Sequence, residues 1–450
     1  MINITFLDIF LTPLYIFLVY LVANAIRVRT IKDINIGKIF IFGLLIKILG
    51  GIVFALINIY LYDGVDSSIY FLGSCELVDV FFQEPIRFFH ILYGQENPIK
   101  YVPSDATYML TYTNSYHNLS VIRFTSIFAI LGLKSYLLTT IIVSFINYVG
   151  VWKLYQLLID IYPKIKNELA IAFLLLPSVI IHGSGISKDS YVLSALFLFI
   201  VYAYNIRNNK GKIYINILVI IISSSILLAI KPYLFYIVFI SVIIWLPTTF
   251  FKIVKSNILK LSIIIPSIIL FWVISSNIIL NYYKDSDNNY IKVGNIIQRS
   301  KLMSRDFQNE KSYGDNYFKN EGLDNNIEKV IFGAPKAIFN GIFRPFVWES
   351  RNVLMIIIGI ESLVILIITS LIVLLGGNNF LRSIAQNNML VLFLVFSLTL
   401  AFFLGNTIAN FGALTRLRIP LIPLYFSSLI IIWHQYIQYK ELNKIDENEK

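Results

Sequence analysis

Long apolar runs recur along this chain and limit what it can fold into. About 20 mostly apolar residues suffice for one helix to cross a bilayer, and such stretches alternate with short polar breaks. They lie near residues 6–25, 39–62, 136–158, 169–182, 190–206, 213–230, 233–250, 261–280, 353–375, 389–404 and 419–436. The sequence therefore predicts an all-α, polytopic integral membrane helical bundle of about eleven transmembrane helices, forming a single membrane domain over residues 1–450.

Composition supports a lipid environment. The chain is 57% hydrophobic and only 14% charged, whereas about half the residues of an ordinary globular protein are apolar. A net charge of +11 would suggest nucleic acid for a soluble protein, but here the basic residues sit in the breaks between apolar runs, where they set membrane orientation. We therefore expect the membrane lipid bilayer as a partner and no nucleic acid. Cys75 is the only cysteine, which excludes a disulfide within the chain.

Lysine and arginine are concentrated in alternate breaks. These basic residues are Arg27, Arg29, Lys32, Lys38, Lys164, Lys166, Arg207, Lys210, Lys212, Lys252, Lys255, Lys260 and Arg382. The positive-inside rule places these breaks, and the charged tail 437–450, in the cytoplasm. We expect a multi-pass protein of the cell inner (cytoplasmic) membrane, and the abundance of Ile, Asn and Lys indicates an AT-rich bacterial genome.

Two long loops fall on the opposite, external face. Residues 63–135 form external loop 1, which is rich in Phe and Tyr and is expected to hold amphipathic helices lying along the interface. Residues 281–352 form external loop 2, which is polar at first and then apolar and aromatic toward Trp348. This second loop is expected to act as a lid that returns to the membrane.

The external turns contain cations that the positive-inside rule does not explain. Together with the acids beside them, these residues are Lys188, Asp189, Lys231, Arg344, Glu349, Arg416 and Arg418. Guanidinium groups bind phosphate oxygens through planar, paired hydrogen bonds, and lysines act as point charges. The set therefore predicts a site for an anionic ligand such as a lipid phosphate.

Structural explanations of the same residues stay open. Lys188 and Asp189 are also consistent with a plain ion pair, Arg344 and Glu349 with a closed turn, and the remaining arginines with lipid headgroup contacts. The run 169–182 is short for a span. Either its ends are misjudged or the turn that follows it lies recessed below the outer surface.

Two acids open external loop 1. Asp63 and Asp66 directly follow the second apolar run, where a carboxylate can act as general base toward a sugar hydroxyl. The alternative is that Asp66 caps an interfacial helix. The four histidines, His90, His117, His182 and His434, show no metal-ligand spacing, so we expect no metal and infer no cofactor. Lys47 is expected to extend toward the cytoplasmic surface.

These residues together resemble the GT-C class of membrane glycosyltransferases, which includes protein O-mannosyltransferases and the lipid A aminoarabinose transferase. The resemblance rests on the many spans, an acid near the start of the first external loop, and the basic-Pro sequences at Lys231, Arg344 and Arg416–Arg418. It implies that Asp66 or Asp63 is catalytic and that the cations bind a polyprenyl-phosphate-linked sugar. The acid follows the second span here, whereas in the class it follows the first.

Several functions stay compatible with the sequence. The first is a glycosyltransferase acting on a lipid-linked sugar at the external face, in surface polysaccharide or glycoconjugate assembly. An O-antigen-type polymerase or ligase would use the external arginines without the aspartate. A transporter or flippase of lipid-linked oligosaccharide, or a non-catalytic membrane partner, is a further alternative, although no internal repeat typical of transporters is visible. The donor sugar, the acceptor and the oligomeric state cannot be read from the sequence.

The charge pattern gives a topology prediction. Reporter fusions at Asn209 and Ser256 should report the cytoplasm, and fusions at Asn114 and Asp315 should report the outside, because basic breaks stay in the cytoplasm. If Asn114 and Asn209 report the same side, the external turns no longer share one face.

Overall fold

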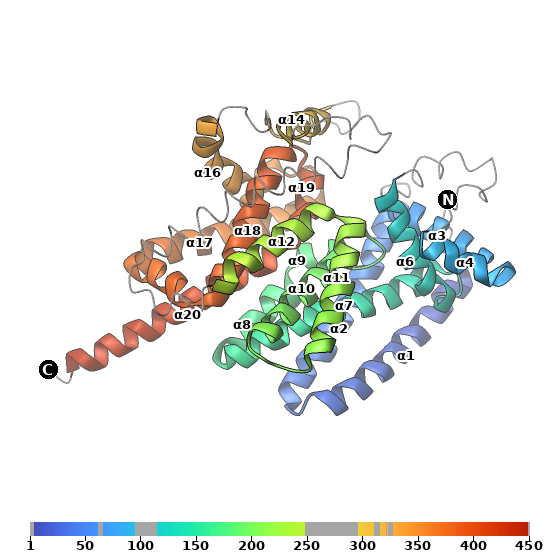
Figure 1. Cartoon of the computed structure of the whole chain (residues 1–450), viewed down its shortest axis with the longest axis horizontal. Coiled ribbons are helices and arrows are strands. Elements are labelled where there is room, and N and C mark those ends of the chain that lie inside the picture. The colour runs from blue at the N-terminus through green and yellow to red at the C-terminus, as the bar shows by residue number, and fades with distance from the viewer. Residues whose placement is uncertain are drawn as a thin grey trace. The chain divides into compact units, whose positions relative to one another are not determined.

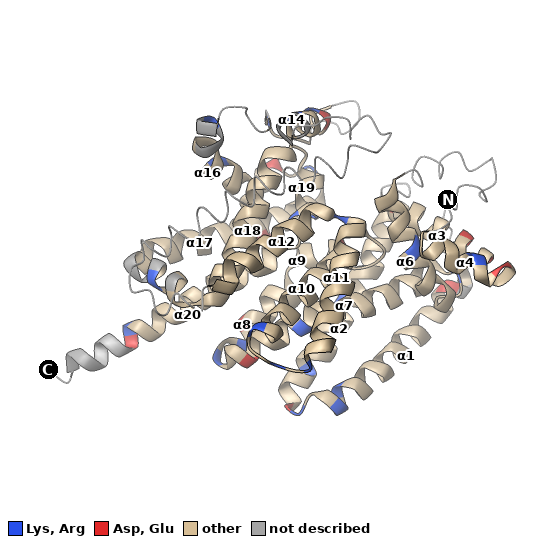
Figure 2. Cartoon of the chain, viewed as in Figure 1, with Lys and Arg blue, Asp and Glu red and all other residues tan. Residues whose placement is uncertain are grey.

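A computed structural model describes residues 4–61, 66–94, 115–247, 296–309, 316–320, 322 and 327–448. Over these ranges the chain is helical and contains no strand, apart from one isolated antiparallel bridge between Tyr317 and Asn410. Most charged residues lie near helix ends, and long stretches of the helices are uncharged (Figure 2). The prediction of an all-α, multi-pass membrane protein is confirmed.

The chain folds as two compact units. Unit 1 comprises residues 1–163 and 173–235, and unit 2 comprises residues 164–172 and 236–450. Helix α12 (Pro232–Trp245) runs from unit 1 into unit 2. Both units contain long apolar helices, and the interpretation of residues 1–450 as one continuous membrane domain stays a prediction.

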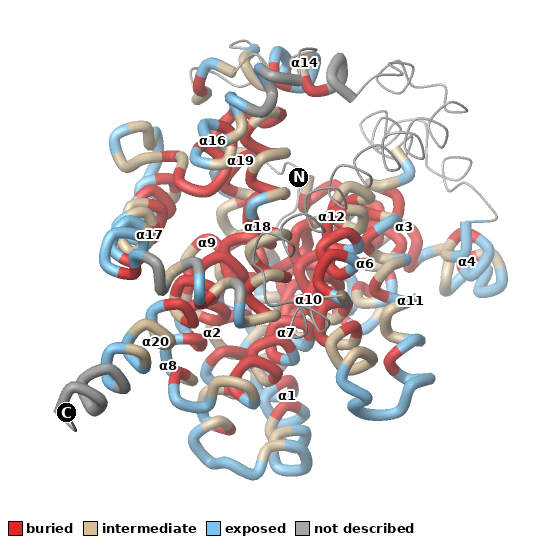
Figure 3. The backbone as a smooth tube through the Cα atoms, turned by 60° about the vertical axis from the view of Figure 1, so that its left-hand side comes forward, coloured by how far each residue is buried: buried red, intermediate tan, exposed pale blue. Residues whose placement is uncertain are grey.

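Unit 1 is built around two central helices. Its helices are α1 (Phe6–Thr30), α2 (Ile34–Tyr60), α3 (Asp66–Gln83), α4 (Pro85–Leu92), α6 (Tyr116–Leu131), α7 (Tyr136–Ile161), α9 (Pro177–His182), α10 (Lys188–Arg207) and α11 (Ile213–Ile230). Helices α7 and α10 lie side by side (Figure 1). In each, 72% of the most apolar 18-residue segment is buried, against 6% in α1. Figure 3 shows the same contrast along the backbone, so α7 and α10 form the core and α1 lies at its edge.

Small residues bring the central helices close together. A Cβ at Gly150 of α7 would overlap the backbone and side chain of Ser194 in α10, and the Gly150 amide donates a hydrogen bond to Ser194 Oγ at 3.2 Å. Close backbone approach of this kind is typical of helix pairs in membranes.

In unit 2, small residues also bring two helices close together. Its helices are α8 (Lys166–Ala170), α14 (Ile296–Asp306), α16 (Ile327–Phe343), α17 (Val353–Gln386), α18 (Asn388–Thr407), α19 (Phe411–Leu417) and α20 (Leu421–Asn448). Ala337 and Gly341 of α16 face Ala401 and Gly405 of α18, and a Cβ on either glycine would overlap a backbone carbonyl of the partner helix. Each pair has four-residue spacing, the small-xxx-small pattern of membrane helix contacts.

Seven of the predicted spans coincide with long apolar helices in the described part of the chain. They are the runs at 6–25, 39–62, 136–158, 190–206, 213–230, 353–375 and 389–404. An eighth, 419–436, belongs to the pair α19 and α20, which are bent by 63° at a short break. The described part of the run 233–250 belongs mainly to the 14-residue helix α12, and 261–280 lies outside the described residues. The count of about eleven spans therefore stays a prediction.

The run 169–182 does not form one helix. It passes from α8 through a π-helical turn at Ile171–Leu175 to the short helix α9, which begins at Pro177. Proline has no backbone N–H and its ring clashes with the preceding turn, so it suits the first position of a new helix and not the interior of an old one.

The described parts of the external loops are mainly helical, and loop 2 also contains the extended segment 316–320. Loop 1 holds α3, α4 and α6, and the exposed Ile86 and Phe89 of α4 suit the predicted interfacial position. In loop 2 the Phe318 amide donates to the carbonyl of Ala409 at 3.0 Å, which fastens the segment 316–320 beside α19. The predicted tail 437–450 starts inside α20, which continues to Asn448.

The contact between α16 and α18 gives a stability prediction. Gly405→Ala should destabilise the protein by about 1–3 kcal/mol, because the new methyl group has no space against the Ala337 carbonyl. Gly333→Ala in α16 is the matched control, since a Cβ there meets nothing within 4 Å. Thermal unfolding of the detergent-solubilised variants measures both, and equal melting temperatures would contradict the packing argument.

Candidate functional site

The turn between α9 and α10 lies recessed within unit 1. The carbonyl of Gly183 accepts a hydrogen bond from the Nζ of Lys47, which lies midway along α2. A Cβ at Gly185 would lie 3.4 Å from the carbonyl of Gly51, also in α2. From Gly51 to the end of α2 at Tyr60 the helix rises a further ~13 Å at about 1.5 Å per residue. Of the two explanations for the short run 169–182, the recessed turn is the one that these contacts favour.

Lys47 therefore has a different position from the one expected. Its side chain is buried and bonded to the recessed turn, so the interpretation that it extends to the cytoplasmic surface is wrong. A buried ammonium needs a partner because desolvation of the charge is expensive. The carbonyl at the end of α9, which has no intrahelical donor, supplies that partner.

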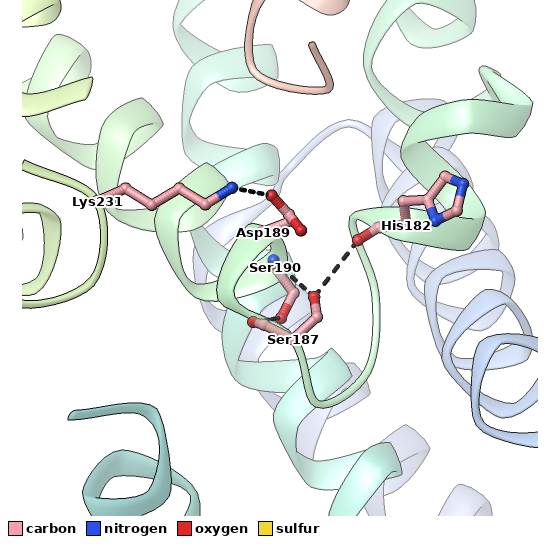
Figure 4. Close-up of polar contacts among 5 residues, drawn as sticks. All are labelled: His182, Ser187, Asp189, Ser190 and Lys231. Carbon is pink, nitrogen blue, oxygen red and sulfur yellow. Dashed lines mark hydrogen bonds and ion pairs between the residues drawn. The ribbon is translucent and has the colours of Figure 1, made fainter. Parts of the chain in front are cut away.

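Serine side chains satisfy the non-helical backbone of this turn (Figure 4). Ser187 is the N-cap of α10, and its Oγ accepts from the Ser190 amide at 3.1 Å. Ser190 Oγ donates to the carbonyl of Gly185 at 2.6 Å and accepts from Asn147 Nδ2 at 3.2 Å. Non-helical backbone inside an apolar bundle is tolerated only when its polar groups find such partners.

Asp189 and Lys231 form a buried ion pair (Figure 4). The side chains are 1% and 8% exposed, respectively. Asp189 lies in the first turn of α10 and Lys231 follows the end of α11, so the pair fastens these helices together. The ion pair considered from the sequence joined Asp189 to Lys188, whereas the structure shows Asp189 paired with Lys231. Binding of a phosphate by Lys231 stays a prediction, and the buried contact with Asp189 does not favour it.

Lys188, the first residue of α10, lies differently. Its side chain is partly exposed, and its Nζ lies 6.0 Å from the ring centroid of Tyr70 in α3. The Tyr70 hydroxyl donates to Asn118 Oδ1 at 3.2 Å. Tyr70 thus links α3 to the start of α10 through Lys188 and to the start of α6 through Asn118.

Asp66 opens α3 beside the same turn. The next residue, Ser67, donates from Oγ to the carbonyl of Ile186 at 2.7 Å, which ties the first turn of α3 to the recessed backbone. Residues four apart lie on the same face of a helix, so Asp66 and Tyr70 are neighbours on one face of α3. Asp66 is partly exposed, and Asp63 lies outside the described residues.

His117 belongs to this neighbourhood, although the sequence gave no reason to choose it. Its Nδ1 lies 2.9 Å from the carbonyl oxygen of Ala229, near the end of α11. Burial lowers the pKa of His117, the positive charge of Lys188 lowers it further, and the hydrogen bond to Ala229 acts in the opposite direction. We define the polar cluster as the partly exposed Asp66, His117, Asn118 and Lys188 around the buried Tyr70.

Arg344 and Glu349 form the ion pair that the sequence left as an alternative. Arg344 Nη2 lies 3.1 Å from Glu349 Oε1, and the guanidinium carbon lies 4.8 Å from the ring centroid of Phe318. Glu349 Oε2 also accepts from the Phe346 amide at 2.9 Å, which closes the turn around Pro345. The Arg344 side chain keeps 24% exposure, so part of the guanidinium remains accessible.

Arg418 is fully buried in unit 2. Its Nη1 donates to the carbonyls of Ile342 at 2.7 Å and Arg344 at 2.5 Å, and its Nη2 donates to Ser362 Oγ at 2.6 Å. The buried Glu361 attracts it electrostatically, which gives this intramembrane acid a partner that the sequence did not reveal. These contacts do not favour the predicted phosphate contact of Arg418. Arg416, in α19, is partly exposed.

The predicted site residues thus fall into two sets. Asp66, Lys188, Asp189 and Lys231 belong to unit 1, and Arg344, Glu349, Arg416 and Arg418 belong to unit 2. Among the described side chains no group of three His, Cys, Asp or Glu residues is arranged to hold a metal ion. No protein-family model, curated protein or solved structure matches this chain.

The buried ion pair gives a stability prediction. Lys231→Met should destabilise the protein by about 3–5 kcal/mol, because it leaves the Asp189 carboxylate buried without its cation. The double variant Asp189→Leu, Lys231→Met should recover part of this loss, since apolar pairs often replace buried ion pairs well. Melting temperatures of the wild type, both single variants and the double variant form a thermodynamic cycle. Additive effects of the two changes would show that the pair contributes no interaction of its own.

Proposed function

We propose that this protein is a membrane glycosyltransferase, resembling the GT-C class, that uses a polyprenyl-phosphate-linked sugar on the external face of a bacterial cytoplasmic membrane. Its role would be in surface polysaccharide or glycoconjugate assembly. One observation carries the proposal. The first turn of α3, which bears Asp66, is hydrogen-bonded through Ser67 to the recessed turn that leads to Lys188.

The proposed base is Asp66. A general base has to reach the hydroxyl that it deprotonates, and Asp66 is partly exposed. Its backbone position is fixed because Ser67 is held from two sides, by the carbonyl of Ile186 and by the hydroxyl of Tyr136 at 2.6 Å. The carboxylate is therefore presented on a rigid helix end and not on a loose loop.

The proposed phosphate contact is Lys188. It starts a 20-residue helix, and the N-terminus of a helix favours anions because its backbone amides and macrodipole are positive there. The neighbouring Asp189 would oppose this effect, but Lys231 neutralises it. The proposed phosphate binds at Lys188, whose side chain is partly exposed.

Together these groups suit an inverting transfer. Asp66 accepts the proton of the acceptor hydroxyl while that oxygen attacks the anomeric carbon. The bond from this carbon to the phosphate oxygen breaks, and the electron pair leaves with the lipid phosphate. Lys188 stabilises the charge that develops on the leaving group.

A second candidate, an O-antigen-type polymerase or ligase, is favoured by the accessible part of Arg344. Its guanidinium lies against Phe318 of external loop 2, and its donors suit the phosphates of a lipid-linked oligosaccharide. In this function Asp66 has no role.

Asp66→Asn separates the two candidates. It should lower transfer by roughly 10²–10⁴-fold, because the amide keeps the size of the side chain and removes the base, whereas exchange at a helix cap is nearly neutral. The measurement is surface glycan in a deletion strain complemented with each variant at equal protein level. Asp79→Asn is the matched control, since Asp79 lies on the same helix in an exposed ion pair with Lys134.

Two outcomes would change the assignment. Full glycan with Asp66→Asn and with the Asp63, Asp66 double Asn variant, together with loss in Arg344→Lys, would replace the transferase by the polymerase or ligase. Normal glycan in the deletion strain itself would show that this glycan does not depend on the protein, which contradicts both candidates.

A further inference from the structure

The hydrogen bond of His117 fixes its tautomer. A backbone carbonyl only accepts hydrogen bonds, so the Nδ1 atom that lies 2.9 Å from the carbonyl oxygen of Ala229 carries the proton. In the neutral ring the other nitrogen, Nε2, then holds a lone pair and acts as an acceptor.

The surroundings favour the neutral form of the His117 ring. Burial and the positive charge of Lys188 both lower the pKa of His117, against the opposing effect of the Ala229 carbonyl. The titratable side chain closest along its own helix is Tyr116, whose ring centroid lies 5.9 Å away. A neutral imidazole beside a lysine offers chemistry that the lysine lacks, because an ammonium group donates hydrogen bonds and cannot accept them.

The position of His117 connects it to the cluster around Asp66. The next residue, Asn118, accepts from the hydroxyl of Tyr70 at 3.2 Å, and Tyr70 carries Lys188 over its ring. His117 itself is partly exposed. The cluster thus combines a cation, a carboxylate and a neutral acceptor on α10, α3 and α6.

We propose that His117 is the sugar-binding residue of this site, whose Nε2 accepts a hydrogen bond from a hydroxyl of the sugar substrate. The proposal rests on the proposed function. The lone pair of Nε2 repels phosphate oxygens that carry no proton. His117 and Lys188 therefore bind different parts of the substrate. Lys188 takes the anionic lipid phosphate, and His117 takes an uncharged hydroxyl.

The tautomer is tested without any activity. The protein, labelled with ¹⁵N-histidine and held in nanodiscs, has four histidines, and the His117 signal is identified by its loss in His117→Gln. We expect a protonated Nδ1 and an unprotonated Nε2 at pH 7. In Lys188→Met the midpoint of the His117 titration should move to higher pH, because a positive neighbour has been removed. A protonated Nε2 in the neutral ring, or an unchanged midpoint in Lys188→Met, would overturn the assignment.

A pair of substitutions separates binding from structure. His117→Asn keeps a donor near the position of Nδ1 and so can keep the bond to Ala229, but it has no acceptor at the position of Nε2. We expect it to lower surface glycan by about threefold to tenfold, the effect of one hydrogen bond, at unchanged protein level and melting temperature. His90→Asn is the matched control, because His90 lies on α4 outside the cluster.

The outcomes also distinguish this inference from the proposed function. Wild-type glycan in His117→Asn with loss in Asp66→Asn overturns the role of His117 and leaves the transferase. Loss in His117→Asn with wild-type glycan in Asp66→Asn supports sugar binding and overturns the proposed base. A deletion strain with normal glycan overturns both, whatever tautomer the spectra show.

Discussion

Unit 1 depends on hydrogen bonds to a stretch of non-helical backbone, residues 183–187, inside an apolar helical bundle. Because neither lipid nor apolar side chains can satisfy such backbone, partners have to come from the surrounding helices. Lys47 supplies one from α2, Ser67 another from α3, and Ser144 of α7 accepts from the Gly185 amide at 3.2 Å. This requirement fixes how closely these helices approach the turn. It also explains Gly185, which has a positive φ of 73° that other residues rarely adopt.

The two units bury cations in different ways. In unit 1 the charge of Lys231 is compensated by a carboxylate, so the pair is neutral and serves as a fastening between α10 and α11. In unit 2 the planar donors of Arg418 reach two carbonyls and a hydroxyl, with Glu361 close enough to attract it. Both devices hold the ends of helices that begin or end within the bundle. Lys231 and Arg418, two of the cations that the sequence predicts to be external, therefore have structural roles.

Because Lys231 and Arg418 have structural roles, fewer cations remain as candidates for binding a ligand. Lys188 is partly exposed and rests on Tyr70, and Arg344 keeps partial exposure despite Glu349. The polar cluster in unit 1 has a further property, since each of its groups has different hydrogen-bonding chemistry. The proposed substrate contains both a phosphate and a sugar and uses this combination, whereas an anion alone needs only the lysine.

The sequence by itself determined the all-α membrane class and the position of seven long helices, because hydrophobic length and helix caps are local properties. It also selected Asp66 and Lys188 from their places beside apolar runs. Tertiary structure decided which cation forms an ion pair with which acid. Lys231 is distant from Asp189 in the chain, and no rule of sequence spacing pairs them. It also decided that Lys47 points into the bundle, and that His117, which contacts a backbone carbonyl 112 residues away, lies near Lys188. Such contacts depend on how helices pack, and packing is set by small residues and buried polar groups acting together, which no single stretch of sequence contains.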